Sequence, residues 1–157
     1  SQNFNLIESD DNDQMSCKYI STGGKDFVLQ ADFKNPYNTT NGWDYGIVFG
    51  SNDGNALYQI VISDPNKWDF YYRLKEEMRI ISGTSKVIKS AKNSVNRIKL
   101  IAAENKSFLF INDEFITEIN LNDQINFYKA ICTDLYNSNG TDENVINVKN
   151  VRLWTIN

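Results

Sequence analysis

Four short segments of alternating apolar and polar residues follow one another between residues 26 and 74, and no helix-like stretch separates them. They read DFVLQADF, WDYGIVFG, ALYQIVIS and WDFYYRL. The connections between them are rich in Asn, Gly, Asp and Pro, which favour turns. Short strands joined by such turns are typical of antiparallel β-sandwiches. The sequence therefore predicts an all-β fold of two antiparallel sheets.

The rest of the chain continues this pattern. No segment shows a convincing helical period of 3.6, and residues 82–94 are expected to form a loop with one edge strand. In residues 150–156, Val151, Leu153 and Thr155 alternate with Arg152 and Trp154, which predicts a strand paired inside a sheet. Trp154 itself is expected to lie in the core. Further strands are expected at residues 15–20, 79–81, 96–102, 107–111, 114–119, 127–136 and 145–156.

The length of 157 residues, without an internal repeat or linker, predicts a single domain over residues 1–157. The sequence shows no initiator Met and no signal peptide. We therefore expect a mature domain or a fragment of a larger exported protein.

The residue content argues against several kinds of chemistry. The absence of His removes the commonest general base, a common metal ligand and every Ser-His or Cys-His nucleophile pair. The net charge of −4 without a basic cluster argues against a nucleic-acid partner. No segment approaches the length of an apolar membrane span, so we expect no membrane insertion.

The two cysteines lie in strand-like segments and do not form a Cys-x-x-Cys zinc motif. In an exported protein, Cys17 and Cys132 could form a disulfide between neighbouring strands. The alternative is two buried free thiols, and the sequence leaves both states open.

In chain order, the later segments read DYGIVFG, LYQIVIS, NRIKLIAAENKSFLFINDEFI, YKAICTDLY and VKNVRLW. This series resembles concanavalin A-like jelly-roll domains, a superfamily that includes legume lectins, laminin-G-like domains and family 16 glucanases. It is most similar to the glucanase-like binding domains of bacterial surface and signalling proteins. The resemblance covers residues 15–155 and implies a jelly roll at an extracellular or cell-surface location. Because the shared motifs are turn and core positions, they specify the fold better than the activity.

Two departures from the family's pattern bear on chemistry. The catalytic signature of family 16 glucanases, Glu-x-Asp-x-x-Glu on one strand, is absent, so we expect no enzyme and no catalytic residues. The final strand has Lys149-Asn150 where the family usually has Asp-Asn, and an acidic residue near that end helps several jelly rolls to bind a structural calcium ion. Residues 10–13, Asp-Asp-Asn-Asp, offer oxygen ligands without EF-hand spacing and are interpreted as an acidic loop. No cofactor is predicted, and calcium dependence stays open.

Alternation divides the side chains of three consecutive strands into a core side and an opposite side. On the core side we expect the residues Tyr45, Ile47, Phe49, Tyr58, Ile60, Ile62, Phe70, Tyr72 and Leu74. On the opposite side, which we expect to be one concave sheet face, lie four residues that suit sugar recognition: Asp44, Gln59, Tyr71 and Arg73. A parity error of one residue would exchange the two sets, and a plain solvated face is the alternative interpretation.

Two tryptophans at strand starts are candidates for the rim of this face. An exposed indole at Trp43 or Trp68 would offer a stacking platform, and the alternative is that both belong to the edge of the core. These features predict a non-catalytic, lectin-like carbohydrate-binding module whose partner is a carbohydrate or surface glycoconjugate. The alternative is an adhesion or protein-interaction module of the same fold, as laminin-G-like domains are. A flat apolar patch would favour that protein partner.

Overall fold

The computed structural model describes residues 2–7, 15–37, 42–121, 127–133, 135 and 145–156, and within them the chain forms β-strands and no helix. No helix long and apolar enough to cross a membrane therefore occurs among these residues. The strands are β1 (Gln2–Ile7), β2 (Ser16–Thr22), β3 (Phe27–Lys34), β4 (Asp44–Ser51), β5 (Ala56–Ser63), β6 (Lys67–Leu74), β7 (Glu77–Thr84), β8 (Val95–Ala103), β9 (Lys106–Ile111), β10 (Glu114–Asn120), β11 (Phe127–Thr133) and β12 (Val145–Thr155).

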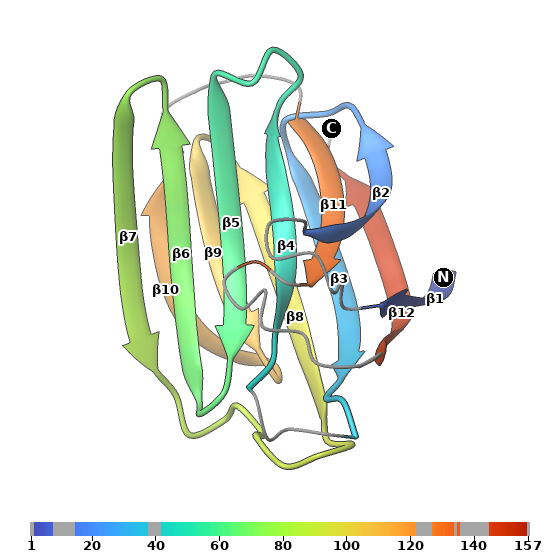
Figure 1. The fold of residues 1–157 in the computed structure, drawn as a ribbon. Helices are drawn as coiled ribbons and strands as arrows, with labels where there is room; N and C mark the ends of the chain where they lie inside the picture. Colours follow the sequence, from blue (N-terminus) through green and yellow to red (C-terminus); the bar gives the residue numbers. More distant parts are fainter. Residues whose placement is uncertain are drawn as a thin grey trace.

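The strands form two six-stranded antiparallel sheets that pack face to face (Figure 1). Sheet A has the order β1-β12-β3-β8-β9-β10, and sheet B has the order β2-β11-β4-β5-β6-β7. Sheet B faces the viewer in Figure 1, with sheet A behind it. The all-β, two-sheet prediction is confirmed. The terminal strand β12 lies between β1 and β3, so the prediction that it is paired inside a sheet is also confirmed.

The core lies between the sheets and is dominated by aromatic rings. Phe33 stacks on Tyr45 with ring centroids 4.5 Å apart, and Trp43 also stacks on Tyr45, at 5.0 Å. Phe49 and Tyr58 stack at 4.9 Å on neighbouring strands. Aromatic pairs of this kind add about 0.5–1.5 kcal/mol each beyond the burial of their surface. The predicted core side of β4, β5 and β6 is buried, with only Leu74 partly exposed.

Two local features differ from expectation or refine it. Strand β7 extends over eight residues instead of three, and residues 85–94 form a loop without a strand. The hairpin between β9 and β10 turns on Asn112 and Asp113, both with positive φ (50° and 68°), as a two-residue type I′ turn requires. Asn and Asp tolerate this backbone region better than most residues, which explains why the hairpin does without the usual Gly.

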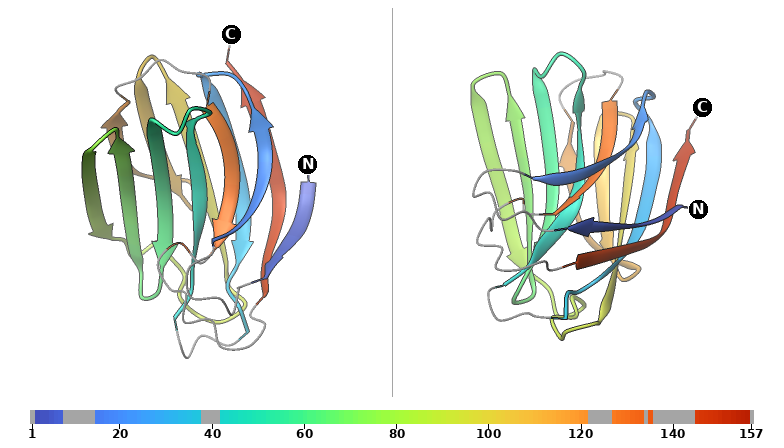
Figure 2. Two further views of the ribbon diagram at one scale, coloured as in Figure 1. Left: turned by 45° about the horizontal axis from the view of Figure 1, so that its top comes forward. Right: turned by 45° about the vertical axis from the view of Figure 1, so that its right-hand side comes forward.

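A disulfide joins Cys17 to Cys132, whose Cα atoms lie 4.2 Å apart on the neighbouring strands β2 and β11. The bridge settles the two alternatives that the sequence left open, and the described residues contain no free thiol. Figure 2 shows β2 at the same end of the sandwich as β1 and β12, where only β11 neighbours it in its sheet. The disulfide therefore ties an edge strand of sheet B to the sheet.

Candidate functional site

The outer face of sheet B carries the predicted site. Strand register aligns one residue from each of the six strands into a row across this face, and the row contains two predicted site residues. In order from β2 to β7 the row is Tyr19, Ala130, Val48, Gln59, Tyr71 and Ile80.

The neighbouring row brings Arg73 onto the same face. Its members in the same order are Thr22, Tyr128, Gly50, Leu57, Arg73 and Met78. Gly50 makes room for the Tyr128 ring, because a Cβ atom at position 50 would lie 3.2 Å from that ring and 2.4 Å from the carbonyl oxygen of Ala56. A larger residue at position 50 would therefore displace Tyr128 or the β5 backbone.

Two tyrosines form the β2 end of this face. Tyr19 is 67% exposed, and its ring meets the half-buried Tyr128 ring edge-on with centroids 6.0 Å apart. Burial is the main factor that raises the pKa of Tyr128; the neighbouring Tyr19 adds to this rise, and the positive charge of Arg73 opposes it. Tyr128 and Arg73 are thus close enough to interact electrostatically on one surface.

The three predicted residues Gln59, Tyr71 and Arg73 lie on this outer side. Tyr71 is half-buried and its hydroxyl donates to the Met78 sulfur at 3.2 Å. Gln59 is largely buried and its amide donates to the Met15 sulfur at 3.8 Å. Arg73 is exposed, and no carboxylate of the described residues lies within ion-pair distance of it.

No protein-family model and no curated protein sequence matches the chain. Sheep galectin-11 in complex with glycerol superposes with a TM-score of 0.66 at 8% identity, over 88% of this chain and 96% of that one. The carbohydrate-binding module CBM66 from Bacillus subtilis gives 0.63 at 14% identity, over 90% and 82%. A family 16 endo-glucanase from Bacteroides ovatus gives 0.68 at 11%, over 97% and 80%.

The chain has the concanavalin A-like jelly-roll fold. Identities this low establish a shared fold and leave the activity open. The fold is carbohydrate-binding in several of these neighbours, by their own descriptions, and it is catalytic in others.

The prediction that Asp44 contacts a ligand on this face is wrong. Asp44 lies on the outer side of β4 as the alternation predicted, but it is only 1% exposed. Its carboxylate accepts a hydrogen bond of 2.7 Å from the backbone N–H of Leu135, and its carbonyl accepts one from Thr133 at 2.7 Å. Asp44 therefore holds Thr133 and Leu135 at the end of β11, and its buried carboxylate is not available to a ligand.

The two tryptophans are also wrongly placed by the rim prediction. Trp43 (1% exposed) and Trp68 (8% exposed) both belong to the core between the sheets of this jelly roll. Trp68 covers Gly83 on β7, where a Cβ atom would lie 2.6 Å from the indole ring. Trp43 lies two residues before the core residue Tyr45, and Trp68 lies two residues before the core residue Phe70. Alternation therefore places both tryptophans on the core side of their strands.

Sequence reasoning missed Tyr19 and Tyr128 as members of the site. Tyr128 has the parity of Ala130 on β11, opposite to the buried Lys129 and Ile131, which was a usable signal. Tyr19 reaches the site only because β2 pairs with β11 across more than a hundred residues of sequence. No local pattern specifies that pairing.

The acidic groups on this face of the jelly roll are few among the described strand residues. Asp69 accepts a hydrogen bond from the Ser82 hydroxyl, and Asp44 is buried two strands away on β4. Two strand spacings amount to about 10 Å, whereas a retaining glycosidase holds its carboxyl groups about 5 Å apart. Within the described ranges no group of three or more His, Cys, Asp or Glu could hold a metal ion. The candidate calcium loop at residues 10–13 lies outside them.

Proposed function

We propose that this domain is a non-catalytic carbohydrate-binding module and that it binds a glycan on the outer face of sheet B. The observation that carries the proposal is the gathering of Tyr19, Tyr128, Arg73 and Tyr71 on two adjacent rows of that face. A tyrosine ring packs on the apolar face of a pyranose, while its hydroxyl and the fixed donors of an arginine meet sugar hydroxyls. Gln59 supplies a carboxamide between them.

Three further observations support the non-catalytic part and the location. Asp44 is buried and already hydrogen-bonded, so the face lacks a close pair of available carboxylates among its described residues. The galectin and CBM66 neighbours, by their descriptions, include a lectin and a carbohydrate-binding module. The Cys17–Cys132 disulfide suits an oxidising compartment, which supports a secreted or cell-surface domain.

The proposal is tested by glycan binding. A glycan array on the purified domain, with and without calcium, selects a ligand, and titration calorimetry then measures its Kd for Tyr71→Ala and Arg73→Ala. Loss of a stacking surface or a charged donor typically costs about 1–3 kcal/mol, so each Kd should rise roughly ten- to hundredfold. The melting temperature should change little because neither residue lies in the core.

Matched control variants sit elsewhere on the surface. Tyr37→Ala removes a tyrosine that is exposed outside the face, and Arg79→Ala removes an exposed arginine that follows Met78 on β7 and has the opposite parity. Both controls should bind the glycan like the wild type. If no glycan binds, or if the controls lose as much affinity as the site variants, the proposal fails.

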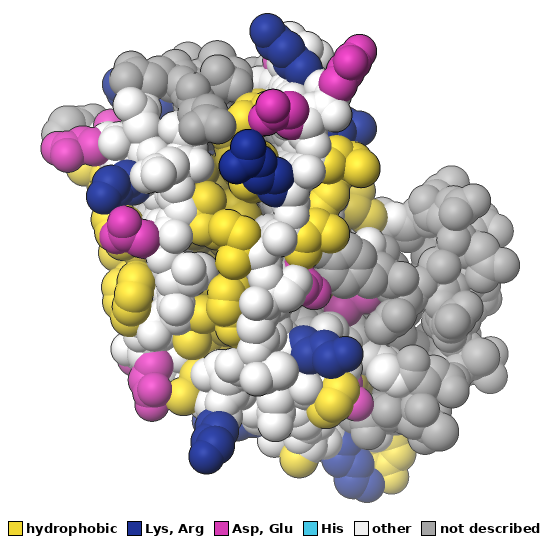
Figure 3. Space-filling view, turned by 90° about the vertical axis from the view of Figure 1, so that its left-hand side faces the viewer, with side chains coloured by type: hydrophobic (Ala, Val, Ile, Leu, Met, Phe, Trp, Pro, Cys, Tyr) yellow, Lys and Arg dark blue, Asp and Glu magenta, His cyan; other side chains and the backbone are white. Residues whose placement is uncertain are grey.

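A protein partner is the second candidate, and one observation favours it. Met78 and Ile80 are exposed on β7 next to Tyr71 and Arg73, and Ile81 is exposed at the same edge. Figure 3 looks onto the edge formed by β7 and β10, and apolar side chains run down the middle of that view. Such a patch beside an open strand edge suits a protein contact. Binding that Ile80→Lys abolishes and Tyr71→Ala spares would favour this candidate.

A further inference from the structure

A groove lies at the edge of the sandwich where β1 begins. Its volume is about 560 Å³, within the range of small-molecule sites. The right-hand view of Figure 2 turns this edge, with β1, β2 and β12, towards the viewer. The lining residues come from all three strands: Gln2, Ile20, Val151, Arg152, Leu153 and Trp154.

The groove borders an incompletely paired strand. Gln2 of β1 pairs with Val151, and beyond that point residues 152–155 of β12 pair only with β3 among the described residues. In an antiparallel strand, backbone N–H and C=O groups point alternately to the two sides. Some backbone donors and acceptors of this stretch therefore face the groove, and no strand of the described residues pairs with them there.

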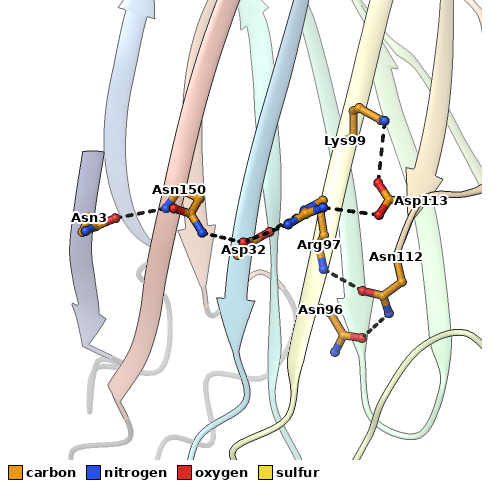
Figure 4. Close-up of polar contacts among 8 residues, drawn as sticks. All are labelled: Asn3, Asp32, Asn96, Arg97, Lys99, Asn112, Asp113 and Asn150. Carbon is orange, nitrogen blue, oxygen red and sulfur yellow. Dashed lines mark hydrogen bonds and ion pairs between the residues drawn. The ribbon is translucent and has the colours of Figure 1, made fainter. Parts of the chain in front are cut away.

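A β-bulge at Asn150 sets which side chains reach the groove. Asn150 has φ 54°, its backbone N–H donates to Asn3 Oδ1 at 3.0 Å, and its side chain donates to Asp32 Oδ2 at 2.8 Å (Figure 4). Asp32 is held in turn by Arg97, with Nε 2.7 Å from Oδ1. The strand register against β3 shifts between Lys149 and Arg152.

This bulge reverses the parity of the last strand. Before it, Ile146 and Val148 face the core, and after it Val151 and Leu153 do. Arg152 and Trp154 are consequently exposed, and the prediction that Trp154 belongs to the core is wrong, since the indole residue is 45% exposed. A left-handed backbone at a non-Gly residue is unfavourable by itself, and bulges at such places often re-aim side chains next to binding sites.

The groove therefore offers an accessible indole, an amide side chain and a guanidinium. Arg97 forms ion pairs with Asp32 and Asp113. Arg152 interacts with Asp32 only at longer range, and no carboxylate of the described residues lies within ion-pair distance of it. A guanidinium binds a carboxylate with two parallel hydrogen bonds, and an indole packs on the apolar face of a sugar ring. A sugar that carries its own carboxylate would satisfy both groups at once.

We propose that this groove is a second ligand site, specific for a hexuronate unit, in which Trp154 stacks on the sugar ring and Arg152 binds its carboxylate. The site is separate from the outer face of sheet B and does not depend on the proposed function of that face. Gln2 and the backbone edge of β12 that no described strand pairs with supply hydrogen-bond partners for the ring hydroxyls.

The test uses two glycosides that differ only at C6, methyl α-D-glucuronide and methyl α-D-glucoside, titrated at low ionic strength. Since Trp43 and Trp68 are buried, a change in indole fluorescence reports on Trp154, and titration by NMR gives the Kd. The glucuronide should bind at least about tenfold more tightly than the glucoside. Arg152→Gln should remove that preference and leave the glucoside Kd within about twofold, because a charged hydrogen-bond pair contributes roughly ten- to hundredfold.

Two further variants separate this site from the face of sheet B. Trp154→Ala should weaken both glycosides at least about tenfold, with folding checked by the melting temperature, and Tyr71→Ala should leave both unchanged. The proposal is overturned if neither glycoside binds saturably, if both bind equally, or if Arg152→Gln keeps the preference. Loss of glucuronide binding in Tyr71→Ala would also overturn it, and would assign the ligand to sheet B instead.

Discussion

The disulfide between Cys17 and Cys132 should be a large contributor to stability. It closes a loop with a sequence separation of 115 residues, so it removes many conformations from the unfolded chain. The loop-entropy relation gives about 5 kcal/mol for a loop of this size, with measured values commonly about 2–5 kcal/mol. For a domain of this length, a loss of 5 kcal/mol corresponds to a fall in Tm of roughly 10–20 °C.

The measurement compares urea unfolding of the oxidised wild type with that of the double variant Cys17→Ala, Cys132→Ala. Alanine is chosen because Cys132 is fully buried, and serine would leave a hydroxyl there without a designed partner. The wild type reduced with a thiol reagent is the matched control and should lose a similar free energy of unfolding. A loss below about 1 kcal/mol in the double variant, or two titratable thiols in native protein prepared without reductant, would refute the reasoning.

Three other perturbations follow from the structure. Deleting residues 150–157 removes half of β12 and uncovers β3, so we expect no cooperative thermal transition, and a soluble truncation with a sharp melt would contradict this. Burial raises the pKa of Asp32, but hydrogen bonds from Arg97 and Asn150 outweigh burial and hold that pKa below 3.8. Asp32→Asn should therefore lower the free energy of unfolding by about 1–3 kcal/mol at pH 7. The difference in unfolding free energy between wild type and variant should shrink as the pH falls below 3.8. Burial lowers the pKa of Lys129 from 10.5 to about 8, so the unfolded chain binds the ammonium proton of Lys129 more strongly than the folded one. The stability of the wild type relative to Lys129→Met should therefore rise from pH 8 to pH 10.5. A difference in urea midpoints between the two proteins that does not change with pH would contradict this prediction.

Local alternation predicted most of the fold because β4, β5 and β6 of sheet B each keep one side in the core. The same rule located Gln59, Tyr71 and Arg73 on the outer side. The expectation that Trp154 lies in the core was wrong, although alternation groups Trp154 with Arg152, opposite Val151 and Leu153. The bulge at Asn150 shifts the register just before these residues, and it depends on a partner, Asn3, that is far away in the sequence. A single sequence carries no local sign of such a partner.

The availability of a residue was harder to predict than its side of the sheet. Asp44 has the predicted parity, yet Leu135 and Thr133 from the far end of the chain occupy its polar groups. Tyr19 and Tyr128 meet through the pairing of β2 with β11. Both outcomes depend on strand pairing over long sequence separations, which the hydrophobic pattern does not encode.

The strand order has a consequence for biosynthesis. β11 lies between β2 and β4, and β12 lies between β1 and β3, so each sheet receives a late strand between two early ones. While the chain emerges from the ribosome, β3 and β4 each keep an unpaired edge until the final segments have been made. Unpaired edges of this kind promote association between nascent chains. Both sheets of this domain should therefore be completed only after β11 and β12 have been made.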